Sequence, residues 1–284
     1  MKQQDIILSI RQRYRNINSF MQMLSEGFEE ERVEGFRQEV ERLKALFFLI
    51  GDAGIDERLI ALYYKIGVIR DLQLLRRELV GYARRKKVRV PESCTAVVDG
   101  LLATASRLVS VDFELCSPDV REPATWGALH GTDIAKLSKV FVGERMKTIS
   151  VGVAEEDLTD AQLQERLTAL KDLLYIWLFL DGKAVGLIRP KSLANRQAIH
   201  SQVDLLGDYQ DSLLRMDLLQ DPNFLFATGP GAKPFLQAVL QEWVLEKQEL
   251  RAKINGALAP EGDRPAGRRR HARPVVRTIT ECSI

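Results

Sequence analysis

A short pattern occurs twice in this chain: a glycine, three residues and an aspartate, set within a long helical stretch. The first copy runs from Gly67 to Asp71 and the second from Gly207 to Asp211. Each copy follows an amphipathic helix that carries a polar stripe beside its apolar one. A repeated unit of this kind predicts a duplicated fold built around a pseudo-twofold axis. A cleft between the two halves is then the expected place for a ligand.

Apolar residues recur at helical spacing along most of the chain, which predicts an all-α protein. Asp56 and Thr159 are typical of helix starts, and Gly51 is typical of a helix end. One candidate strand covers residues 147–154, and residues 115–130 are expected to connect the two halves. The expected helices cover residues 4–26, 30–50, 55–87, 92–114, 131–149, 158–181, 190–219 and 232–255.

These helices are expected to form one domain over residues 1–256, made of two pseudo-repeated antiparallel four-helix bundles. The halves are about 1–115 and 131–256. Residues 257–284 lack apolar periodicity and are expected to be disordered. Six arginines against three carboxylates give this tail a charge of +3, which leaves −1 for the rest of the chain. Anion binding by the helical domain must therefore come from local patches.

Several classes of site have no support in the sequence. The three cysteines and three histidines form no metal-binding spacing. We find no Gly-rich phosphate loop, nucleophile elbow or Cys–His pairing, so we expect neither an enzyme nor a cofactor. No run of about 18 apolar residues is present, and the N-terminus lacks the apolar core of a signal peptide. We expect a cytoplasmic bacterial-type protein with no membrane partner.

Two helices carry the polar stripes. Glu34, Arg37, Glu41 and Lys44 share one face of the helix expected at 30–50. One interpretation is an exposed ladder in which the two glutamates pair with Arg37 and Lys44 along the helix. The other is a ligand-binding wall. A comparable stripe, in the helix expected at 158–181, contains Gln164, Lys171 and Tyr175.

At these residues the chain resembles the CHAD family, the conserved histidine α-helical domains. Four family motifs are matched in order, at residues 33–44, 66–73, 163–175 and 206–211, and the resemblance spans roughly residues 5–255. It implies two four-helix repeats around a basic central cavity that binds inorganic polyphosphate and catalyses no reaction. For some members it also implies association with polyphosphate granules.

The chain departs from the family pattern at the namesake histidines, where Glu34 and Gln164 stand, and at Glu41, where the family has arginine. Leu167 and Leu174 also replace basic positions. The surviving basic residues form the expected polyanion site: Arg37, Arg42, Lys44, Arg70 and Lys171. Arginine suits bidentate phosphate contact, and lysine acts as a mobile point charge.

Two functions remain open. One is binding of inorganic polyphosphate or a related polyanion. The other is a helical scaffold for protein partners that has lost the anion site. The first requires a continuous positive surface in the cavity, and the second predicts paired or neutral walls. A charge map of the cavity discriminates between them.

Other signals have structural explanations as well as functional ones. Gly67 and Gly207 are expected to let helices approach closely where the halves meet, with the following aspartates accepting hydrogen bonds across that contact. The basic run 84–89 either complements a helix dipole or forms an outer lip for a polyanion. The arginines at 268–270 suggest weak, non-specific binding of nucleic acid or polyphosphate. His200 is expected to face the core.

Overall fold

The computed structural model describes residues 3–51, 55–115, 133–150, 158–180, 182–189, 193 and 195–258. These ranges contain helices and no strand, so the all-α prediction is confirmed. The α-helices are α1 (Gln3–Glu26), α2 (Glu30–Ile50), α3 (Glu57–Lys86), α4 (Glu92–Leu115), α5 (Ile134–Ser150), α6 (Asp160–Ile176), α7 (Gly182–Val185), α8 (Arg196–Gln220), α9 (Pro222–Thr228) and α10 (Lys233–Leu258). Two short 3₁₀ helices, η2 (Trp177–Phe179) and η4 (Pro230–Ala232), follow α6 and α9.

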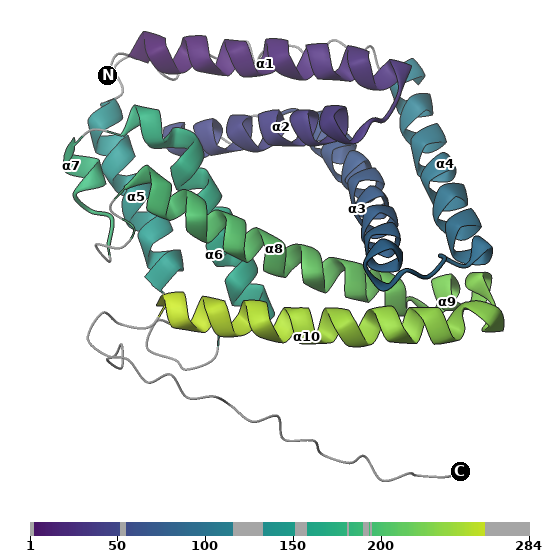
Figure 1. Cartoon of the computed structure of the whole chain (residues 1–284). Coiled ribbons are helices and arrows are strands. Elements are labelled where there is room, and N and C mark those ends of the chain that lie inside the picture. The colour runs from purple at the N-terminus through teal and green to yellow at the C-terminus, as the bar shows by residue number, and fades with distance from the viewer. Residues whose placement is uncertain are drawn as a thin grey trace.

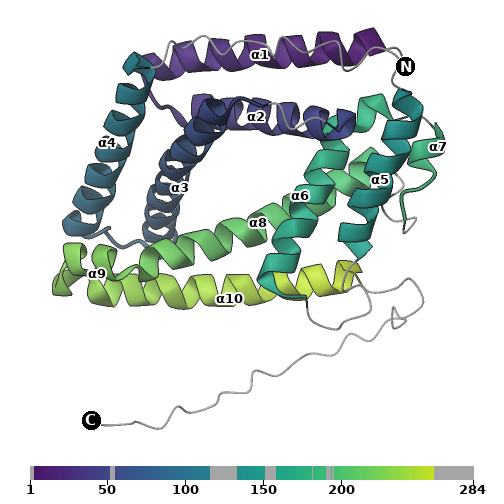
Figure 2. The ribbon, with the colours of Figure 1, turned by 180° about the vertical axis from the view of Figure 1, so that it is seen from behind.

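The helices form an inner frame and an outer layer (Figures 1 and 2). In the inner frame, α2 contacts α3 and α6, and α8 contacts the same two helices, so the four close a ring. Each ring helix is backed by an outer one: α1 packs on α2, α4 on α3, α5 on α6 and α10 on α8. The polar stripes of α2 and α6 therefore both face the middle of the molecule.

Two apolar clusters hold the frame together. The larger one spans both halves and buries the aromatic rings of Tyr14 and Phe36 completely or nearly so. The second joins the ends of α3 and α4 to α8, α9 and α10 around Trp243 and Cys94. Arg215 is buried beside this second cluster, where it bonds Glu78 of α3 and Glu246 of α10 over the Trp243 ring. This buried cation ties the two halves together.

Local signals set the helix boundaries as expected. The Asp56 carboxylate accepts the Arg58 amide, and Thr159 forms a reciprocal capping box with Gln162. Gly51 ends α2 with φ of +72°, a left-handed conformation that favours glycine. These side chains satisfy backbone groups that the helix itself leaves without partners.

Some expected boundaries are wrong. The helix expected at 158–181 ends at Ile176 and tightens into η2, and the one expected at 190–219 begins at Arg196, where Asn195 caps it. The short helices α7 and α9 were not expected, because pieces this short show little periodicity.

Several sequence-based expectations fall on residues outside the described ranges. The strand expected at 147–154 is wrong where it can be checked, since residues 147–150 end α5, and residues 151–154 lie outside those ranges. Most of the 115–130 connection lies outside as well. The tail expected from 257 begins within α10, which runs to Leu258, and residues 259–284 are not described.

Helix α4 is unusually apolar. Over Glu92–Phe113 its length and composition alone would suffice to cross a membrane, which was not expected from the sequence. Here one side of the helix packs on α3 and α9, with Cys94, Val98 and Val109 buried.

Candidate functional site

The inner frame encloses a cavity of about 500 Å³ that is lined by all four ring helices. From the first half, α2 and α3 contribute Glu34, Arg37, Glu41, Lys44, Phe48, Tyr63, Arg70 and Asp71. From the second half, α6 and α8 contribute Gln164, Leu167, Thr168, Lys171, Asp172, Tyr175, Gly207, Gln210, Asp211 and Leu214. The cleft between halves that the repeated pattern predicts is therefore present.

The structure brings four of the five predicted cations together in this cavity: Arg37, Lys44, Arg70 and Lys171. Arg42 is not part of the lining. It donates to Glu39 at 2.5 Å, and Glu39 is buried against α1, where it also accepts from Arg13 at 2.8 Å. Its guanidinium carbon lies 5.8 Å from the centre of the Tyr175 ring, so Arg42 stands beside a lining residue without lining the cavity itself.

Glu41 is the centre of a hydrogen-bonded cluster that crosses the cavity. It accepts the hydroxyls of Tyr63 and Tyr175, each at 2.9 Å, and the Lys171 ammonium at 3.2 Å. Burial acts to raise the pKa of Glu41, but Lys171, the two hydroxyls and Arg37 outweigh it and hold the pKa below its ordinary value. Glu41 is therefore charged at neutral pH.

The expected ladder of pairs along α2 is wrong. Glu41 bonds residues of α3 and α6 instead of Lys44, and the exposed Glu34 accepts from Gln38. Arg37 donates to the Tyr63 hydroxyl at 3.3 Å and lies 4.6 Å from the centre of that ring. The Lys44 ammonium lies 5.3 Å from the same ring centre. The Tyr63 ring thus supports two cations that point toward the cavity.

Arg70 joins the two Gly-xxx-Asp segments. It donates to Asp211 of α8 at 2.7 Å, and its other terminal nitrogen lies 3.5 Å from Asp71. The expected hydrogen bond across the halves is therefore confirmed for Asp211, whereas Asp71 contacts its own neighbour. Burial raises the pKa of Asp71 despite the nearby guanidinium groups of Arg70 and Arg37.

The pKa of Asp172 is shifted in the opposite direction to that of Glu41. Its side chain is buried, and an ion pair joins it to the Arg145 Nε at 2.9 Å. Burial raises the pKa of Asp172 to about 6, because the attraction of Arg145 and Lys44 does not compensate for the loss of water. This carboxylate therefore takes up a proton just below neutral pH.

The two motif glycines differ in their surroundings. A Cβ at Gly67 would overlap the Arg37 guanidinium, so this glycine makes room for a side chain of α2. A Cβ at Gly207 would meet no atom within 4 Å. The expected close helix approach at Gly207 is therefore wrong, because this glycine lies on the open wall of the cavity.

The lining carries four cations and five carboxylates, so its formal charge is −1. Acidic and basic side chains alternate, and Lys171 and Arg70 each have a carboxylate partner. The continuous positive surface implied by the resemblance is not found among the described residues. The charge map matches the paired walls of the scaffold alternative at Lys171 and Arg70, but not at Arg37 and Lys44.

The remaining sequence candidates lie elsewhere. Within the run 84–89, Arg85 and Lys86 pair with Glu242 of α10, and none of the run lines the cavity. The side chain of His200 is 54% exposed and bonds Asp204 at 2.8 Å, so the expectation that it faces the core is wrong. His130, His271 and the arginines at 268–270 lie outside the described residues.

Sequence reasoning missed Tyr63 and Asp172 as lining residues. The signal for Tyr63 was present, because residues 63, 67, 70 and 71 share one face of α3. Asp172 follows Lys171 directly, and adjacent helical positions diverge by about 100°. Its place at the cavity edge depends on its ion pair with Arg145 of α5. The sequence does not reveal how α5 packs on α6.

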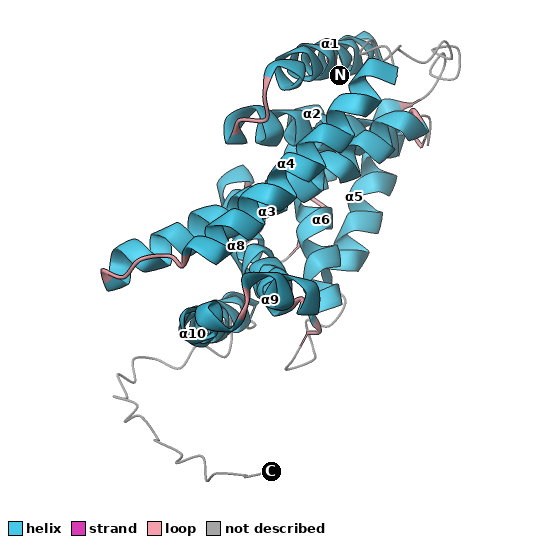
Figure 3. Cartoon of the chain, turned by 90° about the vertical axis from the view of Figure 1, so that its right-hand side faces the viewer, coloured by secondary structure: helices cyan, strands magenta, loops and turns pink. Residues whose placement is uncertain are grey.

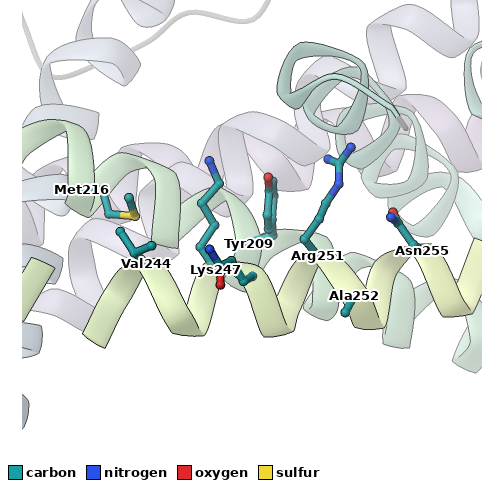
Figure 4. Close-up of a pocket in the computed structure, with 8 residues that line it drawn as sticks. Tyr209, Met216, Val244, Lys247, Arg251, Ala252 and Asn255 are labelled. Atoms are coloured by element: carbon teal, nitrogen blue, oxygen red, sulfur yellow. The ribbon is translucent and has the colours of Figure 1, made fainter. Parts of the chain in front are cut away.

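A second hollow, of about 520 Å³, lies between α8 and α10 (Figure 4). Its polar wall is formed by Tyr209, Lys247 and Arg251, which extend toward the same side. The Tyr209 hydroxyl donates to Asp160 at 2.6 Å, and Lys247 and Arg251 both form ion pairs with that carboxylate. Burial, followed by the Asp160 contact, raises the pKa of Tyr209 to about 12. These contacts fasten the start of α6 to α10.

Comparison with known proteins supports the fold. No family model matches the chain, and no curated protein matches it. The structure is similar to the crystal structure of the CHAD domain from the plant Ricinus communis, with a TM-score of 0.65 and 20% sequence identity. The match covers 88% of each chain. The chain therefore has the fold of a CHAD domain, in which the pseudo-repeat of its halves stays a prediction.

Proposed function

We propose that this chain is a non-catalytic binding protein whose central cavity takes inorganic polyphosphate or a related polyanion. The observation that supports this most directly is the convergence of four cations on one cavity, in the fold of a CHAD domain. Arg37 and Lys44 come from α2, Arg70 from α3 and Lys171 from α6. Residues this far apart in the sequence meet only because the ring closes.

Arg37 and Lys44 are the cations best placed to meet a phosphate. Within the described residues, neither has a carboxylate partner within 4 Å, and both rest on the Tyr63 ring. Guanidinium groups bind phosphate oxygens in a bidentate manner, and hydrogen bonds to charged groups are roughly twice as strong as neutral ones. We therefore assign the first contact with a polyanion to these two side chains.

The carboxylates of the cavity limit the affinity. Glu34 and Glu41 lie on the same helix as Arg37 and Lys44, and each repels a polyanion. Binding is therefore weaker than in a cavity with cations alone. The same proposal predicts a cytoplasmic protein that collects at polyphosphate granules.

The test is a titration of the full chain with long-chain polyphosphate at low and high salt. We expect binding at low salt that Arg37→Ala with Lys44→Ala weakens by at least about tenfold, since each charged hydrogen bond contributes about 1.5–3 kcal/mol. The matched control is Lys136→Ala with Lys139→Ala, which removes two exposed cations of α5 that do not line the cavity.

The tail is controlled in the same experiment by replacing its six arginines with glutamine. Each lost phosphate contact lowers the salt slope by roughly one. We expect the tail variant to keep measurable binding. Loss of all binding in the tail variant, together with no effect of the Arg37 and Lys44 changes, would contradict a polyanion site in the cavity.

The second candidate is a helical scaffold for protein partners. The observation that favours it is that Lys171 pairs with Glu41 and Arg70 pairs with Asp211, so two of the four cavity cations already have a carboxylate partner. Under this alternative the charged cluster fixes the ring and binds no anion. An absence of polyphosphate binding even at low salt would support it.

A further inference from the structure

The outer face of α4 is apolar and has no covering element among the described residues. Helix α4 contacts α3 and α9 on its inner side, and in Figure 3 it crosses in front of α3 on the side that faces the viewer. From Ala96 to Val111, the exposed residues lie within about half of the helix circumference, and the exposed Glu92, Ser93 and Thr95 precede them in the first turn. We call this set the α4 stripe: Ala96, Gly100, Leu101, Ala103, Thr104, Arg107, Leu108 and Val111.

The α4 stripe holds one cation and no carboxylate. Leu108 is 59% exposed, and Leu101 and Val111 are exposed beside it. The acidic residues Asp99 and Asp112 flank the stripe and pair with Arg76 and Lys65 of α3. The Thr104 hydroxyl donates to the Gly100 carbonyl at 2.9 Å, so it needs no water as an acceptor. The stripe is therefore suited to an apolar surrounding.

Basic residues gather at the N-terminal end of α4. The last turn of α3 and the loop that follows it expose Arg84, Lys87 and Arg89, together with the apolar Val88; we call these residues the basic turn. Lys87 has φ of +56°, and its amide closes the end of α3. This left-handed turn sends the chain back into α4, so the cations stand at one end of the apolar stripe.

Helix α9 adds apolar side chains at the same end. It packs on α4, and Phe224 lies in one cluster with Val90 and Val98. Its Phe226 is 89% exposed, and Leu225 is exposed next to it. An aromatic ring and a leucine beside a basic turn are the side-chain types that enter the headgroup region of a bilayer.

We propose that the α4 stripe, with the basic turn and Phe226, is a docking surface for an anionic lipid bilayer. The helix would lie in the plane of the interface, with Leu101, Leu108 and Val111 among the upper acyl carbons. The basic turn would contact lipid phosphates, as clusters of lysine and arginine do beside anionic leaflets. The cations at one end of the stripe favour an anionic bilayer over a second copy of this chain, which brings no excess of carboxylates to that end. The proposal is independent of polyanion binding in the cavity.

The experiment is cosedimentation of the full chain with vesicles of phosphatidylcholine, with and without phosphatidylglycerol. We expect binding to the anionic vesicles, which Leu101→Gln with Leu108→Gln weakens by at least about fivefold. The control is Leu8→Gln with Leu245→Gln, two leucines on other helices that are each 61% exposed. Arg84→Gln, Lys87→Gln and Arg89→Gln together should reduce binding to anionic vesicles by a similar factor.

All variants are made in a chain whose six tail arginines are replaced by glutamine, so that the tail adds no charge of its own. Thermal melts confirm that each variant folds. Arg37→Ala with Lys44→Ala should leave vesicle binding unchanged, which separates this surface from the cavity. Equal binding of the Leu101 and Leu108 variant and its control would overturn the proposal. A change in oligomeric state without a change in vesicle binding would assign the stripe to a second copy.

Discussion

The two walls of the cavity, one from each half of the chain, differ in chemistry. On the first wall, from α2 and α3, six of the eight lining residues are charged. On the second wall, from α6 and α8, three of ten are charged, and the others include Gln164, Thr168 and Gln210. A ligand therefore meets full charges on one side and neutral hydrogen-bonding groups on the other.

The motif glycines show the same difference at close range. Gly67 is covered by the Arg37 guanidinium, whereas Gly207 has open space where a Cβ would be. On the first wall the Arg37 side chain occupies the space beside the glycine. On the second wall the space beside the glycine is open to a ligand. A motif that is repeated in sequence thus serves two purposes in one cavity.

The largest expected effect is on the pH dependence of stability, which should differ between two buried carboxylates, Asp172 on the second wall and Glu41 on the first. Burial raises the pKa of Asp172 from 3.8 to about 6, so the folded state holds this proton more tightly than the unfolded state. Its contribution to stability is present below pH 3.8 and is lost as pH rises through about 6. Between about pH 4 and pH 7, the wild type should lose about 2–3 kcal/mol relative to Asp172→Asn.

Glu41 should behave in the opposite way. Its pKa is lowered, so its contribution to stability is present above its ordinary pKa of 4.5 and is lost as pH falls through the folded value. Urea unfolding at several pH values, for the wild type, Asp172→Asn and Glu41→Gln, measures both trends. Parallel pH profiles for the wild type and Asp172→Asn would show that Asp172 is not held in a low-dielectric site.

A smaller effect is expected from exchanging the residues that stand at the two namesake positions. Glu34→Gln removes a negative charge from the first wall, and Gln164→Glu adds one to the second. Both positions are exposed, and two unit charges 4 Å apart in water interact by about 1 kcal/mol. The first change should therefore raise polyphosphate affinity several-fold, and the second should lower it.

The double exchange, Glu34→Gln with Gln164→Glu, should return the affinity close to that of the wild type. Titrations at one fixed salt concentration measure all three variants. A double variant that binds as weakly as Gln164→Glu alone would mean that the two walls do not act on the same bound anion.

The smallest effect concerns the glycines. Gly207→Ala should raise the free energy of unfolding by about 0.5–1 kcal/mol, because alanine favours a helix and the added methyl meets nothing. Gly67→Ala should raise the free energy of unfolding by less, since its methyl group displaces the end of the Arg37 side chain. Thermal melts of both variants give the comparison, and equal stabilisation would mean that Arg37 moves aside at no cost.

Much of the fold follows from local sequence, because helix periodicity and caps act over a few residues. Asp56, Thr159 and Gly51 set their boundaries as expected. The meeting of Arg37 and Lys44 with Lys171 was also predictable, since the stripes of two helices had to face a common space. The resemblance to the CHAD family implied the central cavity in which they meet.

The partners of those residues were not predictable. Glu41 bonds Lys171 and Tyr175, residues 130 and 134 positions away, instead of the lysine three positions along its own helix. Such choices depend on how α2 and α6 are rotated against each other, which periodicity does not fix. Arg42 was misplaced for the same reason, because it pairs with Glu39 of its own helix, which also pairs with Arg13 of α1.

The closed ring also links occupancy of the cavity to completion of the chain. Arg70 and Asp211 are 141 positions apart, so the cavity has no counterpart in either half alone, and an emerging polypeptide lacks it until α8 is in place. Any cavity ligand then binds the native state and not the unfolded chain. At a free concentration 100 times its dissociation constant, such a ligand adds about 2.7 kcal/mol to the free energy of unfolding. The amount of ligand available would therefore set how long a newly made chain survives proteolysis.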